Sequence, residues 1–393
     1  MSLNTTPSSE RLHIGFFGMR NAGKSSLVNA VTGQSLALVS DIKGTTTDPV
    51  RKAMELLPLG PVVIIDTPGL DDEGTLGEMR VKRAKEVLSG VHIAVLVVDA
   101  LKGMSEEDKD LVKEIESRKT PFIIAVNKSD LLGKVPENEV DTVYVSAEKN
   151  TGINELKEKI AALMETAKSE RKILCDLVSK GDTVMLVTPI DESAPKGRLI
   201  LPQQQTIREL LEVGCITLVV QPGEISEALG KLNTAPKLVI TDSQVFGQVV
   251  KLLPRDMKLT SFSILFARYK GDLEAVVQGA GKLSHLKDGD KILISEGCTH
   301  HRQCKDIGTV KLPDWIKSFS GKELEFAFTS GSEFPDDLSD FALVVHCGGC
   351  TLNEKEMKQR LERCHQQGVP VTNYGTAIAE MNGILQRSLE VFT

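Results

Sequence analysis

The stretch GMRNAGKSS, residues 18–26, decides the fold of this 393-residue chain. It follows an apolar run, HIGFFG (13–18), and precedes an amphipathic stretch at 25–31. A G-x-x-x-x-G-K-S sequence between a strand and a helix forms a loop whose backbone N–H groups point at phosphate oxygens. The helix N-terminus adds partial positive charge at the same place. The sequence therefore predicts a phosphate-binding loop at the first strand–helix connection.

This loop offers most of the contacts that a nucleoside triphosphate needs. Lys24 is placed to reach the β- and γ-phosphates, and the Ser25 hydroxyl is placed to ligate Mg²⁺. The loop residues that we expect to contact the nucleotide are Asn21, Ala22, Gly23, Lys24, Ser25 and Ser26.

Apolar runs alternate with amphipathic stretches from residue 11 to about residue 172. Continuous β-branched runs of this kind are typical of parallel strands buried on both faces. Strands are expected at 13–18, 62–67, 91–100, 121–128 and 142–147, and helices at 25–31, 77–88, 106–118 and 152–167. The pattern predicts a doubly wound α/β domain.

Two motifs add groups near the γ-phosphate. The polar segment DIKGTTTD (41–48) offers Thr46 as a second Mg²⁺ hydroxyl. DTPG (66–69) ends a long apolar strand, which places Asp66 near the metal and the Gly69 N–H near the γ-phosphate. The expected catalytic residues are therefore Lys24, Thr46, Asp66 and Gly69.

Two further motifs would recognise the base. NKSD (127–130) ends a later strand, and Asp130 can accept both the N1–H and the 2-amino group of guanine, which adenine does not offer. After the last strand, the Ala147 N–H can donate to guanine O6. The expected base-binding residues are Asn127, Lys128, Asp130, Ser146 and Ala147. Five motifs in this order, each at a strand end, favour GTP over ATP.

These motifs resemble those of the TrmE–Era–EngA family of GTPases. The resemblance implies a K⁺ ligand at Asn21 and backbone K⁺ ligands in the segment 40–45. Leu70 stands where Ras-like proteins carry the catalytic glutamine, and an apolar side chain cannot orient water. A K⁺ ion near the phosphates would instead promote hydrolysis by neutralising the negative charge that develops on them in the transition state. We therefore expect K⁺-stimulated hydrolysis of GTP to GDP and phosphate.

Composition and charge narrow the function classes. The net charge of −7 argues against a generic nucleic-acid binder, whose electrostatic footprint would be basic. The first ten residues show no signal-peptide pattern, and no apolar run reaches the roughly 18 residues that spanning a bilayer needs. We expect a cytoplasmic protein that binds neither nucleic acid nor membrane.

The rest of the chain predicts two smaller α/β domains, so that the expected boundaries are 1–172, 173–262 and 263–393. The middle segment shows strands at 182–188, 215–220 and 237–241 and helices at 203–213, 223–231 and 242–252. It carries no phosphate loop or ligand cluster, which favours a structural or oligomerisation role. The last segment shows strands at 290–297 and 340–346 and helices at 353–367 and 375–388.

Each of the two strands in the last segment ends at a group of cysteines and histidines. CTH (298–300) and HCGGC (346–350) offer three thiolates, Cys298, Cys347 and Cys350, and two imidazoles, His300 and His346. Neighbouring strands could bring both loops together. Three thiolates with one histidine would suit structural Zn²⁺, and three thiolates with a replaceable fourth ligand would suit a 4Fe–4S cluster. The residues alone do not separate the two, and the spacing slightly favours structural zinc.

A C-x-H pair followed about fifty positions later by H-C-x-x-C, downstream of a GTPase domain, resembles the HydF family of FeFe-hydrogenase maturation GTPases. The resemblance implies a 4Fe–4S cluster on Cys298, Cys347 and Cys350. The sequence offers His300, His346 or a nearby acid such as Asp306 as the fourth ligand and does not choose among them. The resemblance also implies that residues 173–262 form a dimerisation domain and that residues 263–393 bind the cluster.

The same resemblance implies a scaffold and carrier function. Such a protein receives a diiron precursor made with the radical maturases HydE and HydG and delivers it to the FeFe-hydrogenase apo-protein as a homodimer. The alternative hypothesis is a regulatory Era- or TrmE-like GTPase whose zinc module acts on RNA. The acidic net charge weakens that alternative.

Overall fold

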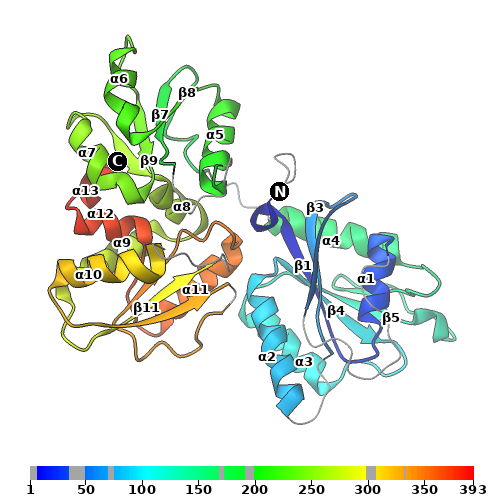
Figure 1. Cartoon of the computed structure of the whole chain (residues 1–393). Helices are drawn as coiled ribbons and strands as arrows, with labels where there is room; N and C mark the ends of the chain where they lie inside the picture. The colour runs from blue at the N-terminus through cyan, green and yellow to red at the C-terminus, as the bar shows by residue number, and fades with distance from the viewer. Residues whose placement is uncertain are drawn as a thin grey trace. The chain divides into compact units, whose positions relative to one another are not determined.

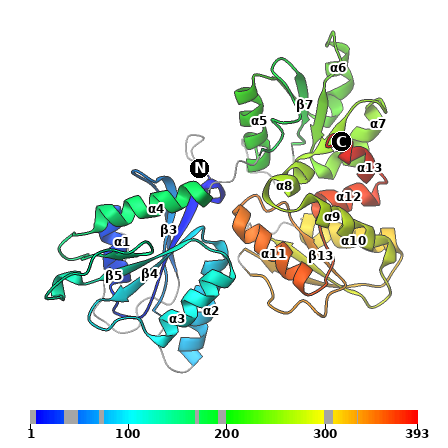
Figure 2. The same cartoon turned by 180° about the vertical axis from the view of Figure 1, so that it is seen from behind.

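The structure is a computed structural model that describes residues 7–34, 49–69, 75–167, 172–190, 199–297, 307–331 and 333–393. The chain divides into two compact units, Met1–Glu170 and Arg171–Thr393. Figure 1 shows the elements of both units, and Figure 2 shows them from behind. None of the helices in these ranges has both the length and the apolar character needed to cross a bilayer.

The first unit is built on one sheet, whose described strands have the order β2-β3-β1-β4-β5-β6. All neighbours are parallel except β2 with β3. The strands are β1 (Leu12–Phe17), β2 (Val50–Leu56), β3 (Gly60–Asp66), β4 (Ile93–Asp99), β5 (Phe122–Asn127) and β6 (Thr142–Tyr144). The helices are α1 (Lys24–Thr32), α2 (Thr75–Gly90), α3 (Glu106–Ser117) and α4 (Ile153–Ala167). This arrangement confirms the predicted P-loop domain.

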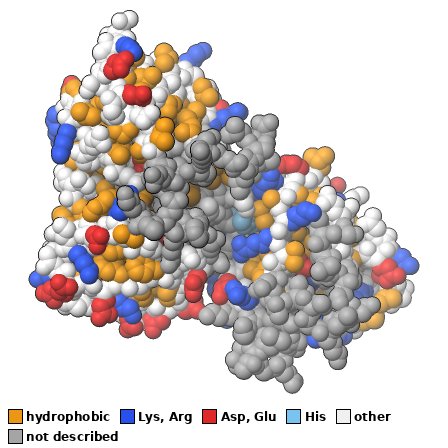
Figure 3. All heavy atoms as spheres, in the orientation of Figure 1, with side chains coloured by type: hydrophobic (Ala, Val, Ile, Leu, Met, Phe, Trp, Pro, Cys, Tyr) orange, Lys and Arg blue, Asp and Glu red, His pale blue; other side chains and the backbone are white. Residues whose placement is uncertain are grey.

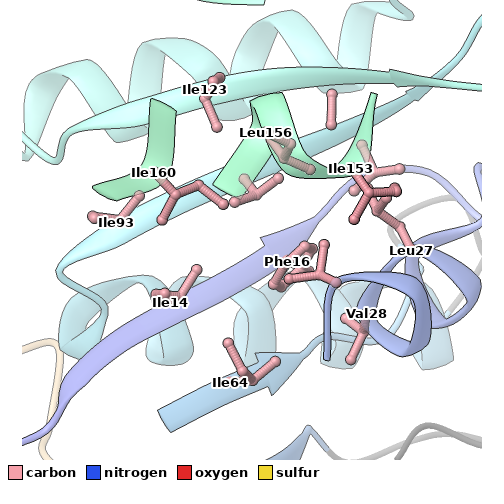
Figure 4. Close-up of a cluster of buried hydrophobic side chains, with 14 of the residues drawn as sticks. Ile14, Phe16, Leu27, Val28, Ile64, Ile93, Ile123, Ile153, Leu156 and Ile160 are labelled. Carbon is pink, nitrogen blue, oxygen red and sulfur yellow. The ribbon is translucent and has the colours of Figure 1, made fainter. Parts of the chain in front are cut away.

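Both faces of this sheet are buried because its strands are apolar on both sides. Ile14 and Phe16 of β1 pack with residues of α1 and α4, as Figure 4 shows. The next residue, Phe17, points to the other face and packs with residues of α2 and α3. Side chains alternate between faces along a strand, so a continuous apolar run fills two cores at once.

Strand β2 was absent from the expected pattern. Its central residues Arg51, Lys52 and Ala53 are exposed, so no apolar run marks it. It lies at the edge of the sheet and, among the described strands, pairs with β3 alone. Arg11 Nη1 also donates to the Met54 carbonyl at 2.7 Å.

The second unit contains two parallel sheets, with described strands in the orders β10-β9-β7-β8 and β12-β11-β13-β14. The first comprises β7 (Thr183–Val187), β8 (Ile216–Val220), β9 (Leu238–Thr241) and β10 (Leu259–Ser261). The second comprises β11 (Lys291–Glu296), β12 (Glu325–Ser330), β13 (Leu343–His346) and β14 (Val371–Asn373). We call them the middle sheet and the cysteine sheet. The helices are α5 (Leu201–Val213), α6 (Ile225–Gly230), α7 (Phe246–Leu252), α8 (Phe262–Lys270), α9 (Leu273–Ala280), α10 (Leu312–Ser320), α11 (Glu354–Gln366), α12 (Tyr374–Met381) and α13 (Leu385–Leu389).

The sequence pattern missed three strands of this unit and misread one helix. Strands β10 and β14 have three residues each, too few for a periodic signal, and β12 is a half-exposed edge strand. The single helix expected at 375–388 is wrong, because α12 and α13 are separate. Gly383 lies between them with φ 66°, a left-handed conformation that ends a helix.

The two sheets share packed residues, so the boundary expected at residue 262 lies inside one compact unit. Helix α8 begins where β10 ends, and its Phe262 and Leu265 pack in a core of the middle sheet. Ala267 of the same helix packs in a core of the cysteine sheet. The end of the chain returns to the middle sheet, where Val391 is buried.

The close packing of α9 on β14 gives a test of this unit. A Cβ atom on Gly279 would clash with the Val371 carbonyl oxygen, whereas a Cβ atom on Gly281 would meet nothing within 4 Å. We expect Gly279→Ala to lower the free energy of unfolding of this unit by about 1–3 kcal/mol, because the backbone must move. Urea titration followed by fluorescence of Trp315, the single tryptophan, measures this unit alone.

Gly281→Ala is the matched control and should stay within about 0.5 kcal/mol of the natural chain. Equal unfolding midpoints for the two variants would contradict the packing described here.

Candidate functional site

The predicted phosphate loop lies between β1 and α1 in the first unit. Gly23 precedes α1 with φ 87°, and Asn21 has φ 61°. A Cβ atom on Gly23 would clash with the amide nitrogen of Asn127, so only glycine fits this position. The loop therefore turns tightly around the N-terminus of α1, as a phosphate loop requires.

Lys24 is buried at the start of α1. Its ammonium donates to the carbonyl oxygens of Gly18 at 2.9 Å and of Met19 at 2.8 Å. These bonds hold the positive charge over the centre of the loop. Phosphate oxygens entering the loop can replace the two carbonyls as acceptors.

Asp66 is the last residue of β3. It lies beside Ser25 of α1, whose hydroxyl could bind Mg²⁺. The Ser25 hydroxyl donates to Asp66 Oδ2 at 2.6 Å. The other oxygen, Oδ1, is buried and has no hydrogen-bond partner among the described residues. Burial raises the pKa of Asp66, against the opposing effects of Ser25 and Lys24. A hydroxyl and an unsatisfied carboxylate oxygen fit the oxygen ligation that Mg²⁺ prefers.

The DTPG segment is held against the phosphate loop. The Thr67 hydroxyl and N–H both donate to the Phe16 carbonyl at the end of β1. A Cβ atom on Gly69 would come within 2.9 Å of Arg20 Cα, so the two backbones are in close contact. Gly69 therefore lies next to Arg20 of the phosphate loop.

Asn127 joins three of the predicted motifs. It is buried at the end of β5, where its Nδ2 donates to the Ala22 carbonyl at 3.0 Å and its Oδ1 accepts from the Ala147 N–H at 3.0 Å. The Ala147 N–H therefore has a protein acceptor in this structure, and guanine O6 would have to share it. Asp130 is exposed and Ser146 is buried.

Lys128 extends from β5 to the phosphate loop. Its ammonium donates to the Asn21 carbonyl at 2.7 Å and to Asp99 Oδ2 at 2.6 Å. Burial acts to raise the pKa of Asp99, but Lys128, the Leu101 N–H and Lys102 together lower it, and the net shift is downward. We did not predict Asp99 from the sequence, although its place at the end of β4 was a signal for it. Thr46, the segment 40–45 and Leu70 lie outside the described residues.

The second candidate site lies at the carboxyl edge of the cysteine sheet. Strands β11 and β13 are parallel neighbours, and Ser295 pairs with His346. The Gly297 N–H donates to Cys347 Sγ at 3.0 Å, and Thr351 Oγ1 donates to the Gly297 carbonyl at 2.7 Å. The HCGGC loop therefore contacts the residue that precedes Cys298. Cys298 itself, His300, Cys304 and Asp306 lie outside the described residues.

The two described cysteines of this loop, Cys347 and Cys350, are half-buried. Burial raises the pKa of Cys347 to about 11, against the opposing effect of the Gly297 N–H. Burial also raises the pKa of Cys350, while Lys270 and the N–H groups of Thr351 and Cys350 act to lower it. Backbone N–H groups directed at sulfur suit cluster-bound thiolates. In the described ranges, no group of three or more Cys, His, Asp or Glu side chains is arranged to hold a metal.

His346 supports the loop through both ring nitrogens. Nδ1 lies 2.8 Å from the Cys347 carbonyl oxygen, and Nε2 lies 3.1 Å from Nη1 of Arg360. Burial, followed by Arg360, lowers the pKa of His346 to about 3, so the ring is neutral. Because arginine is always a donor, Nε2 accepts and Nδ1–H donates. The imidazole would have to give up one of these bonds to become the fourth cluster ligand.

Lys270, which sequence reasoning missed, completes this loop. It is 2% exposed at the end of α8. Its ammonium donates to the carbonyl oxygens of Gly349 at 3.3 Å, Cys350 at 3.1 Å and Leu352 at 2.9 Å. A lysine in the last turn of a helix gave no signal that would connect it to a loop 80 residues away.

Three family models match the chain. Residues 13–128 match "50S ribosome-binding GTPase", residues 173–271 match "Hydrogen maturase F dimerization domain", and residues 274–391 match "Hydrogen maturase F tetramerization domain". The first unit is thus a GTPase domain.

Individual relatives match over part of the chain. The tRNA modification GTPase MnmE of Clostridioides difficile is 32% identical over 163 residues, which are 39% of this chain and 35% of that protein. GTPase Der of Nitratidesulfovibrio vulgaris is 39% identical over 125 residues, 31% of this chain and 25% of that protein. The chain thus spans about a third or less of the length of these relatives.

A solved structure of Era from Aquifex aeolicus matches with a TM-score of 0.36 at 18% identity, over 61% of this chain and 97% of that chain. The two hydrogen maturase F models cover different segments, residues 173–271 and 274–391, which together exceed half of the chain. With a GTPase domain preceding both segments, the chain belongs to the hydrogen maturase F (HydF) family.

Proposed function

We propose that this protein is a GTP-hydrolysing scaffold and carrier that binds a 4Fe–4S cluster and assembles or delivers the diiron subcluster precursor to FeFe-hydrogenase. Family membership supports the maturation role. The observation that carries the cluster site is the hydrogen bond from the Gly297 N–H to Cys347 Sγ, because it joins the loop that leads into Cys298 to the HCGGC loop.

Nucleotide chemistry would be performed at the carboxyl edge of the first sheet. Lys24 would release its loop carbonyls to bind the β- and γ-phosphates, and Gly69 would donate its N–H to the γ-phosphate. The hydroxyls of Ser25 and Thr46 would hold Mg²⁺. Asp66 would accept hydrogen bonds from groups that ligate the ion. Bound Mg²⁺ would neutralise charge on the phosphates. Hydrolysis of GTP then requires positioning and electrostatic stabilisation rather than covalent catalysis.

The cluster would be held by Cys298, Cys347 and Cys350, and His300 stays a candidate for the fourth position. Bound iron–sulfur cluster would supply an exchangeable iron site for cargo. The chain itself contributes sulfur ligands, the N–H groups of Gly297 and Gly349 directed at Cys347 Sγ, and a buried surround. An exchangeable fourth ligand suits a carrier, because cargo must bind and leave.

The proposed partners follow from family and chemistry. A homodimer is supported by the dimerization model matched by residues 173–271. HydE, HydG and apo-hydrogenase would exchange cargo with the cysteine sheet. On the face seen in Figure 3, Lys and Arg side chains lie scattered among acidic and apolar ones, which is in keeping with protein rather than nucleic-acid partners.

Guanine recognition can be tested at Asp130. The Asp130 carboxylate would accept two hydrogen bonds from guanine, and the uncharged amide in Asp130→Asn can accept at only one of its two atoms. We therefore expect GTP affinity to fall by at least about 100-fold. Xanthosine triphosphate, which carries an oxygen at C2, should bind the variant better than GTP does. Titration of fluorescent nucleotides measures both, and Asp141→Asn, at another exposed aspartate, is the matched control. Unchanged GTP affinity in Asp130→Asn would contradict this assignment.

The K⁺ proposal can be tested at Asn21. We expect faster GTP hydrolysis in K⁺ than in Na⁺, because the ion would stabilise charge on the phosphates. Asn21→Gly removes the amide but keeps the left-handed backbone at φ 61°, so it should lose the K⁺ preference and still bind GDP. Asn154→Ala, on the exposed face of α4, is the control. Equal rates of the natural chain in both salts would refute the K⁺ site and leave GTP binding standing.

The cluster proposal can be tested by anaerobic reconstitution with iron and sulfide. The natural chain should bind about four irons, and electron paramagnetic resonance of the reduced protein should show a 4Fe–4S signal. Cys347→Ser should lose the cluster but keep GTP hydrolysis, since the nucleotide site lies in the other unit. Cys175→Ser, at a half-buried thiol elsewhere in the second unit, should keep both. Uptake of zinc alone would overturn the carrier function.

A further inference from the structure

A buried positive charge holds the loop that carries two of the proposed cluster ligands. The Lys270 ammonium donates to three carbonyl oxygens within four residues, those of Gly349, Cys350 and Leu352. Its own side chain is almost fully buried and lies over the Phe266 ring at 5.9 Å. Burying an ammonium is costly unless it is well hydrogen-bonded, so the loop and the lysine stabilise each other.

The planarity of the peptide bond explains what this contact does to the sulfur ligands. In a trans peptide the carbonyl and the following N–H point in opposite directions. Because the Gly349 and Cys350 carbonyls point at Lys270, the N–H groups of Cys350 and Thr351 point away from it. Lys270 therefore fixes the direction of the two N–H groups that flank the Cys350 side chain.

The lysine is attached to the middle sheet through its helix. Helix α8 starts at the end of β10, with the Ser261 hydroxyl accepting from the Ile264 N–H as the N-cap. Phe262, Leu265 and Phe266 anchor the helix in the core of the middle sheet. The last residue of this anchored helix is Lys270. Displacement of α8 would therefore displace the support of the cysteine loop.

We propose that Lys270 is a positioning residue of the cluster site, which holds the loop of residues 347–352 in its ligating shape and ties it to the middle sheet through α8. The inference rests on the proposed cluster function and adds to it. The lysine donates to backbone carbonyl groups of the loop, so it would act through the loop and through its charge.

The charge has a consequence that simple packing would not have. Reduction of the cluster adds one negative charge, and a cation nearby favours that state. Lys270 should therefore raise the reduction potential of the cluster. Lys270→Met removes charge and donors, whereas Lys270→Gln removes the charge and keeps a short donor. Both variants should lower the potential, and Lys270→Met should in addition loosen the loop.

Loop shape can be measured without any cluster. In the apo-protein, the rate at which an alkylating reagent modifies Cys347 and Cys350, followed by mass spectrometry, reports how often the loop opens. We expect Lys270→Met to raise this rate by about tenfold or more, because three buried carbonyls lose their donor. Lys270→Gln should give a smaller increase.

Two controls separate positioning from general instability. Lys251→Met removes an exposed lysine in the last turn of α7 and should change neither readout. Gly279→Ala destabilises the same unit at α9 and should leave the cluster potential of the folded protein unchanged. Trp315 fluorescence confirms that each variant is folded under the conditions of the measurement.

The outcomes distinguish this inference from the cluster proposal. If the natural chain takes up no iron, the cluster function fails, and the alkylation rates still decide whether Lys270 holds the loop. If the natural chain takes up iron but Lys270→Met matches Lys251→Met in alkylation rate and potential, the positioning role is refuted. Faster alkylation with a lowered potential supports it.

Discussion

Parallel strands end at the same edge of a sheet, and both candidate sites are built on that constraint. In the first unit it gathers Asp66, Asp99 and Asn127 around the loop that follows β1. In the second unit the register of β11 on β13, with Ser295 opposite His346, places Gly297 beside Cys347. A shift by one residue would turn each side chain to the other face and separate the two loops.

A buried lysine in each unit donates hydrogen bonds to backbone carbonyls, with different consequences. Lys24 has two loop carbonyls as acceptors, and phosphate oxygens are stronger acceptors that can replace them. Lys270 has three carbonyls within one short loop, and no incoming ligand of the proposed function would compete for its ammonium. The first arrangement is therefore suited to ligand exchange, and the second to holding a loop in place.

The elements that the sequence predicted correctly are those with a strong local pattern of apolar residues. The buried strands β1, β3, β4 and β5 were found because their apolar runs are continuous. Strand β2 was missed because its exposed residues carry no such run, and the break between α12 and α13 was missed because one glycine decides it. Asp99 and Lys270 were missed because their partners, Lys128 and the 349–352 carbonyls, are distant in sequence or belong to the backbone.

The sequence by itself determined the GTPase domain, because a glycine-rich loop and four strand-end motifs use residue types that guanine, phosphate and Mg²⁺ require at fixed spacings. It also identified the two cysteine-bearing segments, since the positions of cysteine and histidine residues are given directly by the sequence. Only the tertiary structure decided that β11 and β13 are neighbours, that both nitrogens of His346 are engaged, and that Lys270 lies beneath the HCGGC loop. Strand order and long-range hydrogen bonds depend on how elements pack, and packing is a property of the whole chain rather than of any local segment.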